Sequence, residues 1–228
     1  MNYFRDILHL FFPKLCITCN TQLLETEQLL CTLCRHDLPL ICYKSYKDNK
    51  IAKSFAGKIQ IENATALLFY RKTGKTKKLI HALKYKSGQE IGTMFGNWLG
   101  VTLKQAHQFD TIAFIIPVPL HPRKQKQRGY NQVTTFGLSL AKQLNKTYLP
   151  DVLIRISAAK TQTFKQRFER FNNSSTKFYL TDKHLLANKH ILLIDDVITT
   201  GATLEACCKE LFRAANVKIS IATIAYTE

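Results

Sequence analysis

The sequence predicts an α/β protein in which a mostly parallel sheet is flanked by helices and preceded by a small cysteine-rich module. Three observations support this prediction. From residue 64 onward, short apolar strands alternate with helical patterns, as expected for right-handed βαβ units. Four of the seven cysteines lie within the first 34 residues. The chain has 228 residues, 46% of them hydrophobic, which suffices for one domain of ordinary size and an appendage.

The elements of the first half follow from periodicity. Residues 3–12 place apolar side chains at helical spacing and predict a short amphipathic helix. A compact apolar run predicts a strand at 66–70. Two further helical patterns follow at 76–86 and 91–107, and a near-continuous apolar strand at 111–116 comes after them.

The second half continues the alternation with a helix at 131–144 and a strand at 152–156. The segment 157–177 is polar and is predicted as a long functional loop, because loops of this length are rare in compact domains without a role. The strongest buried strand is predicted at 190–194. The last predicted elements are a helix at 203–215 and a strand at 217–226.

The charge balance is strongly basic. Thirty-three Lys and Arg against 16 Asp and Glu give a formal net charge of +17, which points to polyanionic partners such as nucleic acid, phosphate-rich ligands or an acidic membrane face. The longest apolar runs, at 112–118 and 191–194, fall far short of the ~20 residues that a membrane span needs. Asp6 and His9 interrupt the N-terminal apolar stretch, which lacks a small-residue cleavage site. We therefore expect no secretory signal and a cytoplasmic protein.

The cysteines near the N-terminus form two tight Cys-x-x-Cys pairs separated by eleven residues. In a reducing compartment, such pairs are typical of tetrahedral thiolate ligands for structural zinc, and the hairpin at 20–30 is long enough to close on one ion. A redox dithiol is the alternative, but it needs one pair rather than two. The predicted zinc ligands are Cys16, Cys19, Cys31 and Cys34.

The other three cysteines are not assigned to the metal. Cys42 stands alone and receives no role, whereas Cys207 and Cys208 fall in an apolar helical pattern and are predicted core residues. We divide the chain into an amphipathic helix with the zinc-finger module (1–42), a basic connection (43–62) and the main domain (63–228).

The most informative segment runs from residue 191 to residue 203. Four apolar residues form a strand, and the adjacent carboxylates Asp195 and Asp196 follow at its carboxyl end, where open α/β sheets bind ligands. Carboxylates accept hydrogen bonds, so this pair suits a vicinal diol or a hydrated magnesium ion. The next residues open a helix whose backbone N–H groups and dipole suit a phosphate. They are Thr199, Thr200, Gly201, Ala202 and Thr203.

One strand, turn and helix thus offer a diol site beside a phosphate site, which are the polar features of a ribose 5-phosphate. Gly201 lets the backbone approach a ligand closely, and the threonine hydroxyls add hydrogen bonds. The alternative is an ordinary solvated Asp-Asp turn with a threonine N-cap. Thirteen residues in this order argue against that alternative.

This segment resembles, at every position, the phosphoribosyl-pyrophosphate (PRPP) signature of type I phosphoribosyltransferases. Nearly end to end, the chain is similar to the ComF family of competence-associated, phosphoribosyltransferase-like proteins with an N-terminal zinc finger. Members of that family often carry a further cysteine pair, of which this sequence keeps only Cys42, so a single zinc ion is expected. The other supporting stretches are residues 83–86, 117–124 and 128–132, and Thr161-Gln162 with Arg170 and Asn172.

The resemblance implies a type I phosphoribosyltransferase fold for residues 63–228, with PRPP or ribose 5-phosphate as ligand and Mg²⁺ bridging pyrophosphate and ribose. It implies that Asp195 and Asp196 engage the ribose hydroxyls and that residues 199–203 hold the 5-phosphate. It further implies a pyrophosphate loop at 117–132 and a closing loop at 157–177. The residues assigned to these two loops are Arg123, Lys124, Arg128, Gln162 and Arg170.

The activity implied is pentosyl transfer with loss of pyrophosphate from the anomeric carbon, in DNA uptake (natural competence) or in nucleotide metabolism. No segment of the sequence identifies the acceptor. The alternative is a non-enzymatic accessory protein of the DNA-uptake machinery that senses a phosphoribosyl ligand and binds single-stranded DNA. Residues 44–86 hold twelve Lys and Arg against two acidic residues, and interleaved aromatics would stack on bases. Lysines outnumber arginines 24 to 9 along the chain. This general excess of lysine weakens the case for a dedicated DNA-binding surface at 44–86. The aromatic residues are Tyr43, Tyr46, Tyr70 and Tyr85.

Overall fold

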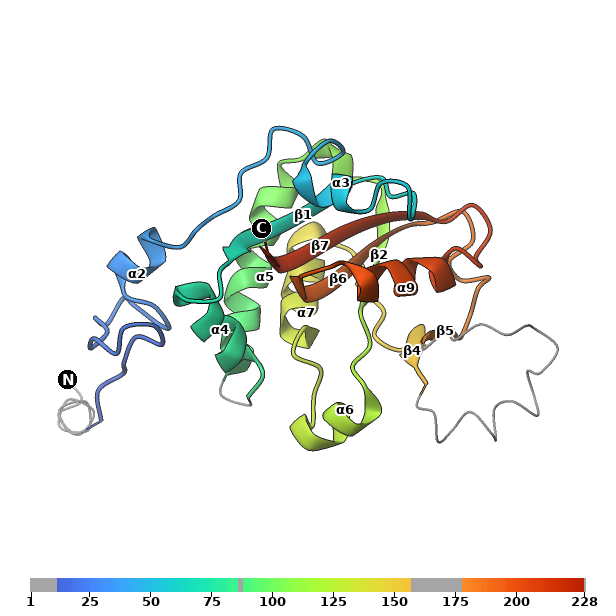
Figure 1. The fold of residues 1–228 in the computed structure, drawn as a ribbon. Coiled ribbons are helices and arrows are strands. Elements are labelled where there is room, and N and C mark those ends of the chain that lie inside the picture. Colours follow the sequence, from blue (N-terminus) through green and yellow to red (C-terminus); the bar gives the residue numbers. More distant parts are fainter. Residues whose placement is uncertain (1–11, 86–87, 157–177, 228) are drawn as a thin grey trace.

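The strands of the central sheet are β1 (Ala64–Tyr70), β2 (Ile112–Pro117), β3 (Thr147–Tyr148), β6 (His190–Ile198) and β7 (Lys218–Thr227). The computed structural model describes residues 12–85, 88–156 and 178–227 (Figure 1). The five strands lie in the order β1-β7-β6-β2-β3, and every neighbouring pair is parallel. The predicted α/β class with a parallel sheet is therefore confirmed.

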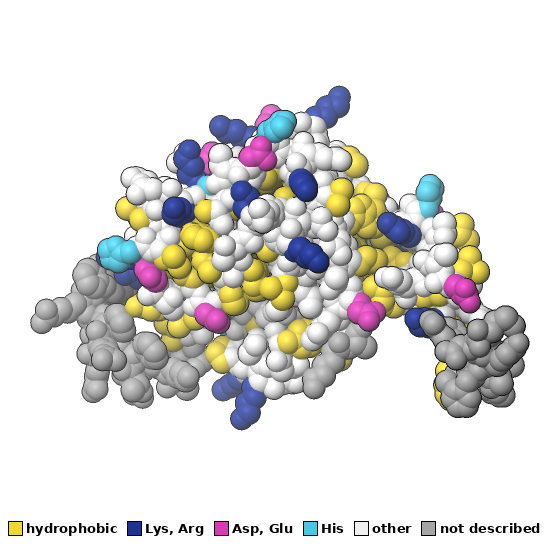
Figure 2. All heavy atoms as spheres, turned by 180° about the vertical axis from the view of Figure 1, so that it is seen from behind, with side chains coloured by type: hydrophobic (Ala, Val, Ile, Leu, Met, Phe, Trp, Pro, Cys, Tyr) yellow, Lys and Arg dark blue, Asp and Glu magenta, His cyan; other side chains and the backbone are white. Residues whose placement is uncertain are grey.

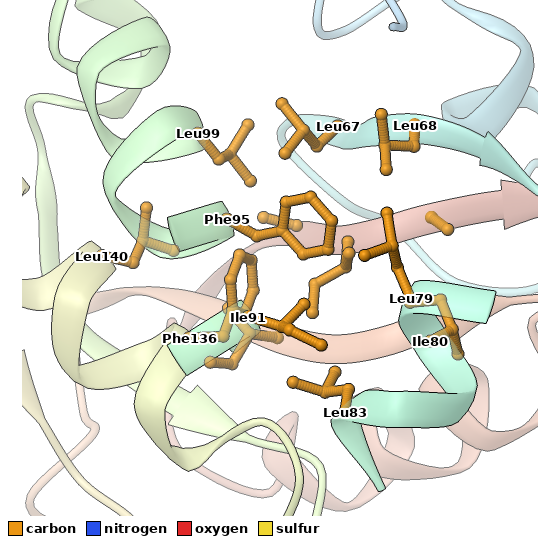
Figure 3. Close-up of a cluster of buried hydrophobic side chains, with 14 of the residues drawn as sticks. Leu67, Leu68, Leu79, Ile80, Leu83, Ile91, Phe95, Leu99, Phe136 and Leu140 are labelled. Carbon is orange, nitrogen blue, oxygen red and sulfur yellow. The ribbon is translucent and has the colours of Figure 1, made fainter. Parts of the chain in front are cut away.

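Five helices of the described residues cover the sheet. They are the short α3 (Lys50–Ser54) and the longer α4 (Lys75–Leu83), α5 (Gln89–Lys104), α7 (Thr134–Leu144) and α9 (Ala202–Leu211). Helices α4, α5 and α7 cover one face, where Phe95 and Phe136 lie at the centre of an apolar cluster (Figure 3). Helices α3 and α9 cover the other face. There Cys207 and Cys208 are fully buried, which confirms their prediction as core residues.

The alternation of strand β6 explains this two-sided core. Leu192 and Ile194 belong to the cluster under α5 and α7, whereas Ile191 and Leu193 belong to the cluster under α9. Successive side chains of a strand point to opposite faces. A strand buried on both faces therefore reads as a continuous apolar run, and this is the pattern from which the sequence predicted it.

Strand β6 is longer than predicted. It continues to Ile198, so Asp195 and Asp196 lie inside the strand rather than after it. Pairing with β7 continues to this end, whereas pairing with β2 stops where Pro117 faces Ile194. From β2 the chain continues to β3 at one edge of the sheet, whereas from β6 it continues to β7 on the side of the opposite edge. The end of β2 beside β6 is thus the topological switch point of the sheet, the usual place for a ligand.

The strand predicted at 152–156 does not join the parallel sheet. Its regular part is β4 (Leu153–Arg155), which pairs antiparallel with β5 (Phe178–Leu180), a strand that the sequence did not predict. The short β3 already occupies the edge beside β2, so β4 has no place in the parallel order. The predicted loop 157–177 lies outside the described residues, as does most of the predicted helix at 3–12.

The predicted loop at 117–132 contains an unexpected helix, α6 (Pro122–Arg128). The His121 side chain accepts a hydrogen bond from Arg123 N, Pro122 starts the helix, and Gly129 ends it with φ 78°. Its residues are almost all polar and leave no buried face, so hydrophobic periodicity could not reveal it. The sequence also missed α2 (Thr32–His36), α3 and the short helix η2 (His107–Phe109). Among the described residues, no helix is long and apolar enough to cross a membrane.

The cysteine module lies against α4 and α5. Lys75 Nζ is 2.7 Å from Asp37 Oδ2, and Lys78 Nζ donates to the Thr18 carbonyl at 2.6 Å. The guanidinium of Arg35 lies 5.3 Å from the centre of the Trp98 ring. Buried residues of the module share one apolar cluster with these helices. The module is therefore packed onto the domain rather than tethered to it.

A buried polar network joins the amino ends of the central strands, opposite the switch point. Both ring nitrogens of His190 lie near hydroxyls, with Nδ1 2.7 Å from Thr111 Oγ1 and Nε2 2.9 Å from Ser220 Oγ. Asn63 donates to the same serine at 3.3 Å. Burial lowers the pKa of His190 because the charged imidazolium would lose hydration.

We predict that this histidine makes stability depend on pH. A pKa lower in the folded than in the unfolded state stabilises the fold above pH ~6.5, the pKa of unfolded histidine, and this stabilisation is lost as the pH falls through the folded pKa. In His190→Gln, the free energy of unfolding should be lower at pH 7.5, and its difference from wild type should shrink towards pH 5. Urea unfolding across this range measures it. A difference that stays constant with pH would contradict the prediction.

Candidate functional site

The two carboxylates at the switch point belong to adjacent residues of β6, and their side chains lie close enough to interact. Both residues are half-buried. Asp195 Oδ1 accepts the N–H of Asp196 at 2.8 Å, and Asp196 Oδ1 accepts the N–H of Val197 at 2.8 Å. These short local bonds orient one oxygen of each carboxylate towards its own backbone and leave the other oxygen for a further partner.

A polar chain connects Asp196 to the segment after α6. Gln132 Nε2 donates to Asp196 Oδ2 at 3.2 Å, and Arg128 Nη1 donates to Gln132 Oε1 at 2.7 Å. Gln132 is only 8% exposed, so its amide is held in place. The structure thus brings Arg128, one of the predicted pyrophosphate residues, towards the carboxylates. Gln132 was part of a recognised stretch but was assigned no role. No local signal marks its contact with Arg128, because Gly129 ends α6 between the two residues and the chain path beyond the helix brings them together.

The electrostatic environment of Asp195 opposes its ionisation. Burial raises the pKa of Asp195 well above its ordinary value, and the charge of Asp196 raises it further, while Lys84 opposes this shift. Lys84 follows α4 directly. Two neighbouring carboxylates that repel each other and are partly removed from water are stabilised by a cation or by a hydroxyl donor. Their environment therefore fits a magnesium ion or a ribose diol.

The turn after β6 places the predicted phosphate residues at the start of α9. Thr199, Thr200, Ala202 and Thr203 are exposed, and α9 begins without a side-chain cap. Gly201 is buried and has φ 75°, a left-handed conformation that favours glycine. The N–H of Ala202 donates to Thr200 Oγ1 at 3.4 Å, a long bond that an anion would replace, and the exposed start of α9 gives an anion access to the N–H groups that follow.

The close approach at Gly201 is to the protein itself. A Cβ at this position would lie 2.9 Å from the ring of Phe55, the residue that ends α3. A larger residue would therefore press against Phe55 and strain the turn, because its Cβ would point into the protein at a positive φ. Nothing in the local sequence predicts this contact, because Phe55 lies in the basic connection at 43–62, far from Gly201 along the chain.

The remaining predicted residues are distributed unevenly. Arg123 and Lys124 lie on the exposed surface of α6, and within the described ranges neither forms an ion pair with the carboxylates. Gln162 and Arg170 lie outside the described residues. Tyr130 anchors the segment after α6, since its hydroxyl donates to the Leu83 carbonyl at 2.9 Å and also contacts the Tyr85 carbonyl.

Comparisons with known proteins agree with this arrangement. Residues 134–228 match the family model described as "Phosphoribosyl transferase domain". The chain is 35% identical over 109 residues to "Competence protein F" of Haemophilus influenzae, covering 47% of this chain and 48% of that protein. It is 30% identical over 146 residues to "DNA utilization protein YhgH" of Escherichia coli O157:H7, covering 62% and 63%. These matches span less than two thirds of either relative.

A longer match extends over 211 residues of "Competence protein ComFC" of Bacillus subtilis, with 26% identity, 90% of this chain and 81% of that protein. Among solved structures, adenine phosphoribosyltransferase of Saccharomyces cerevisiae is 18% identical with a TM-score of 0.34, covering 66% of this chain and 68% of that one. The fold and the family match define a phosphoribosyltransferase-like protein. The matches to competence and DNA utilization proteins support the resemblance to the ComF family that the sequence motifs indicate.

The second candidate site is the cysteine cluster. Its four Sγ atoms, from Cys16, Cys19, Cys31 and Cys34, all lie within 4.8 Å of one another. Cys19 and Cys31 Sγ are 3.7 Å apart, close to the about 3.8 Å expected between ligands of a tetrahedral zinc ion with Zn–S bonds of about 2.3 Å. The structure thus assembles the predicted ligand set.

The surroundings favour the thiolate form at Cys16 and Cys19. Burial raises the pKa of Cys16, but hydrogen bonds from the Thr18 hydroxyl at 3.2 Å and the Cys31 N–H at 3.4 Å outweigh it and lower the pKa to about 5. The N–H of Cys34 donates to Cys31 Sγ at 3.4 Å, but burial and the neighbouring thiols outweigh this bond and raise the pKa of Cys31 to about 12. Thiolates are the form that binds zinc, so the donor set fits this metal.

The proposed stacking surface for nucleic acid is not assembled as the sequence suggested. Tyr46 is half-buried and its ring packs edge-on against Phe109, with centroids 5.0 Å apart. Tyr43 and Tyr70 are also half-buried, whereas Tyr85 is 56% exposed. On the face in Figure 2, Lys and Arg side chains of the described residues are dispersed among neutral and apolar groups. On that face, positive charge is spread rather than concentrated.

We predict that the purified, reduced protein contains about one zinc ion per chain, the stoichiometry of a four-cysteine site. Cys31→Ser should lose the metal and lower the melting temperature, because the buried members of the module belong to the same apolar cluster as α4 and α5. Elemental analysis and thermal unfolding measure both effects. Cys42→Ser is the matched control, since this exposed thiol lies outside the cluster. Zinc-free wild-type protein, or full zinc in Cys31→Ser, would refute the assignment.

Proposed function

We propose that this protein binds PRPP together with Mg²⁺ at the carboxyl ends of β2 and β6 and transfers its phosphoribosyl group. The observation that carries the proposal is the pair Asp195–Asp196, placed at the switch point and tied through Gln132 to Arg128. The uncapped start of α9 lies directly after it in the chain. A diol site and a phosphate site on one strand, turn and helix match the two ends of a ribose 5-phosphate.

Each group has a distinct part in this proposal. Asp195 and Asp196 accept hydrogen bonds from the ribose hydroxyls, and the first N–H groups of α9 bind the 5-phosphate with the help of the helix dipole. Arg128 faces the pyrophosphate, with Arg123 and Lys124 on the same segment and Gln162 and Arg170 assigned from the second loop. When bound, Mg²⁺ supplies charge neutralisation for pyrophosphate, and the carboxylates are the residues that would hold its hydrated ion.

The reaction proposed is a displacement at the anomeric carbon. The bond to pyrophosphate breaks as the bond to an acceptor forms, and the ribose passes through a state with oxocarbenium character. Negative charge builds on the leaving pyrophosphate, and guanidinium groups such as that of Arg128 stabilise it. The carboxylates hold the ribose in the orientation that exposes the anomeric carbon.

The biological context proposed is the uptake or use of DNA in the cytoplasm, since relatives bear the names competence protein and DNA utilization protein. The alternative within this context is a non-enzymatic role, in which the site senses a phosphoribosyl ligand while basic residues bind single-stranded DNA. Tight PRPP binding without release of pyrophosphate, over a panel of bases and amines, would favour that role.

Substitution of the carboxylates tests PRPP binding directly. Asp195→Asn and Asp196→Asn should each weaken Mg-dependent PRPP binding about 10- to 100-fold, as expected for loss of a hydrogen bond to a charged group. Gln132→Leu should also weaken it, because Asp196 and Arg128 lose their common partner. Isothermal titration calorimetry measures the affinities.

The control for this experiment is Asp110→Asn, which removes the same charge from an exposed position just before β2, at the opposite end of the sheet. It should bind PRPP as the wild type does. Undiminished affinity in both β6 variants would show that the Asp-Asp pair is only structural, and the transferase proposal would fall with it.

Binding of single-stranded DNA has its own test. If phosphates provide the affinity, its logarithm should fall with the logarithm of salt concentration by roughly 0.7 per contacted phosphate. Replacing the exposed Lys72 and Lys77 by Gln should reduce this slope, whereas replacing the exposed Lys104 and Lys142 should not. Fluorescence anisotropy with a labelled oligonucleotide measures the slope. Affinity that is independent of salt would exclude this mode of binding.

A further inference from the structure

A second polar hollow lies where the zinc module meets the start of α4, apart from the switch point. Its volume is about 310 Å³, and it is lined by Asp37 of the module and by the turn that connects β1 to α4. The turn contributes Arg71, Gly74 and the first helical residues, Lys75 and Thr76. The residues proposed to bind PRPP do not line it.

The backbone at this hollow is arranged as a helix start without a cap. Helix α4 has nine residues, and its N-cap Gly74 provides no side-chain hydrogen bond. Gly74 has φ 129°, which an L-residue rarely adopts. A helix start of this kind presents unpaired N–H groups and the positive end of the dipole. By itself this is a common feature of proteins.

The second, independent observation is the hydroxyl of Thr76. This residue is only 3% exposed, and its Oγ1 is buried without a hydrogen-bond partner among the described residues. A buried hydroxyl without a partner costs free energy, and native structures rarely leave one unexplained. Thr76 lines the hollow. A ligand with an acceptor oxygen at this place would satisfy its hydroxyl.

The charges around the hollow define the ligand. Arg71 and Lys75 line it, and Lys75 Nζ is held by the Asp37 carboxylate at 2.7 Å. The carboxylate thus provides the anionic oxygen that the lysine otherwise lacks. An incoming anion would compete with Asp37 for Lys75 while also reaching the helix start and the Thr76 hydroxyl.

We propose that this hollow is a binding site for a phosphoryl oxyanion, held by Arg71, Lys75, the hydroxyl of Thr76 and the first N–H groups of α4. Three tetrahedrally arranged oxygens accept from a cation, a hydroxyl and backbone amides at once, which a single carboxylate does not do. The anion is a free phosphate or phosphate ester, or a phosphate of a nucleic-acid strand. Because the anion would take Lys75 from Asp37, its binding would loosen this ion pair between the cysteine module and α4.

Amide NMR gives a readout that is specific to this site. Titration of the zinc-loaded, full-length protein with sodium phosphate should shift the amide signals of Gly74, Lys75 and Thr76. These shifts are distinct from those of residues 200–203, where phosphate would occupy the proposed PRPP site. They should persist in Asp196→Asn, so failure of the transferase proposal would leave this test unaffected.

Matched variants separate the parts of the site. Thr76→Val removes only the hydroxyl and should weaken the phosphate response about tenfold, whereas Thr76→Ser should retain it. Lys75→Gln should weaken binding by a similar factor. Asp37→Asn should act in the opposite direction and strengthen binding, because it removes the competing carboxylate. Thermal unfolding of each variant without phosphate checks that the fold is intact.

Single-stranded oligonucleotides with and without a 5′-phosphate distinguish the sources of the anion. If sodium phosphate alone shifts the three amides, the ligand is a small phosphate or phosphate ester. If only oligonucleotides do so, and equally with or without the end group, the ligand is a backbone phosphate. The proposal is overturned if neither shifts these amides, or if Thr76→Val and Lys75→Gln respond as strongly as the wild type.

Discussion

The site depends on the unequal pairing of β6. Its ladder with β7 runs to Ile198, whereas its ladder with β2 ends at Ile194. Four apolar residues upstream bury both faces of the strand and fix its register, since a slip of one residue would turn the core side chains to the wrong face. The carboxylates are consequently held on a rigid strand at the point where one of its neighbours has ended. Rigidity and access are thereby combined at one position.

The surrounding elements hold the functional groups in place rather than add chemistry. Tyr130 ties the segment after α6 to the end of α4, and Gln132 ties it to Asp196. Phe55 supports the turn at Gly201 from the opposite side. Most of these contacts join segments distant in sequence. Loss of one of them would therefore displace a loop without removing any residue that touches a ligand.

The zinc module is linked to the same framework. Its buried cysteines join the apolar cluster of α4 and α5, and Lys75 and Lys78 of α4 contact it through Asp37 and the Thr18 carbonyl. Helix α4 therefore touches the module at its start, while Lys84, which follows its end, influences the pKa of Asp195. One short helix connects the cysteine cluster, the hollow at its own start and the carboxylate pair. The module is therefore connected through α4 to the site at the switch point.

The alternation of strands and helices, the cysteine cluster and the position of the Asp-Asp segment at the carboxyl end of a buried strand could all be predicted from the sequence, because each depends on residue types at fixed local spacing. Tertiary structure alone decided where β6 loses its neighbour, that β4 leaves the parallel sheet, and that Gln132 joins Arg128 to Asp196. The polar helix α6 and the burial of Tyr46 against Phe109 also escaped the sequence. Hydrophobic periodicity reports which side of an element is buried, but the partner across the contact is set by the packing of distant segments.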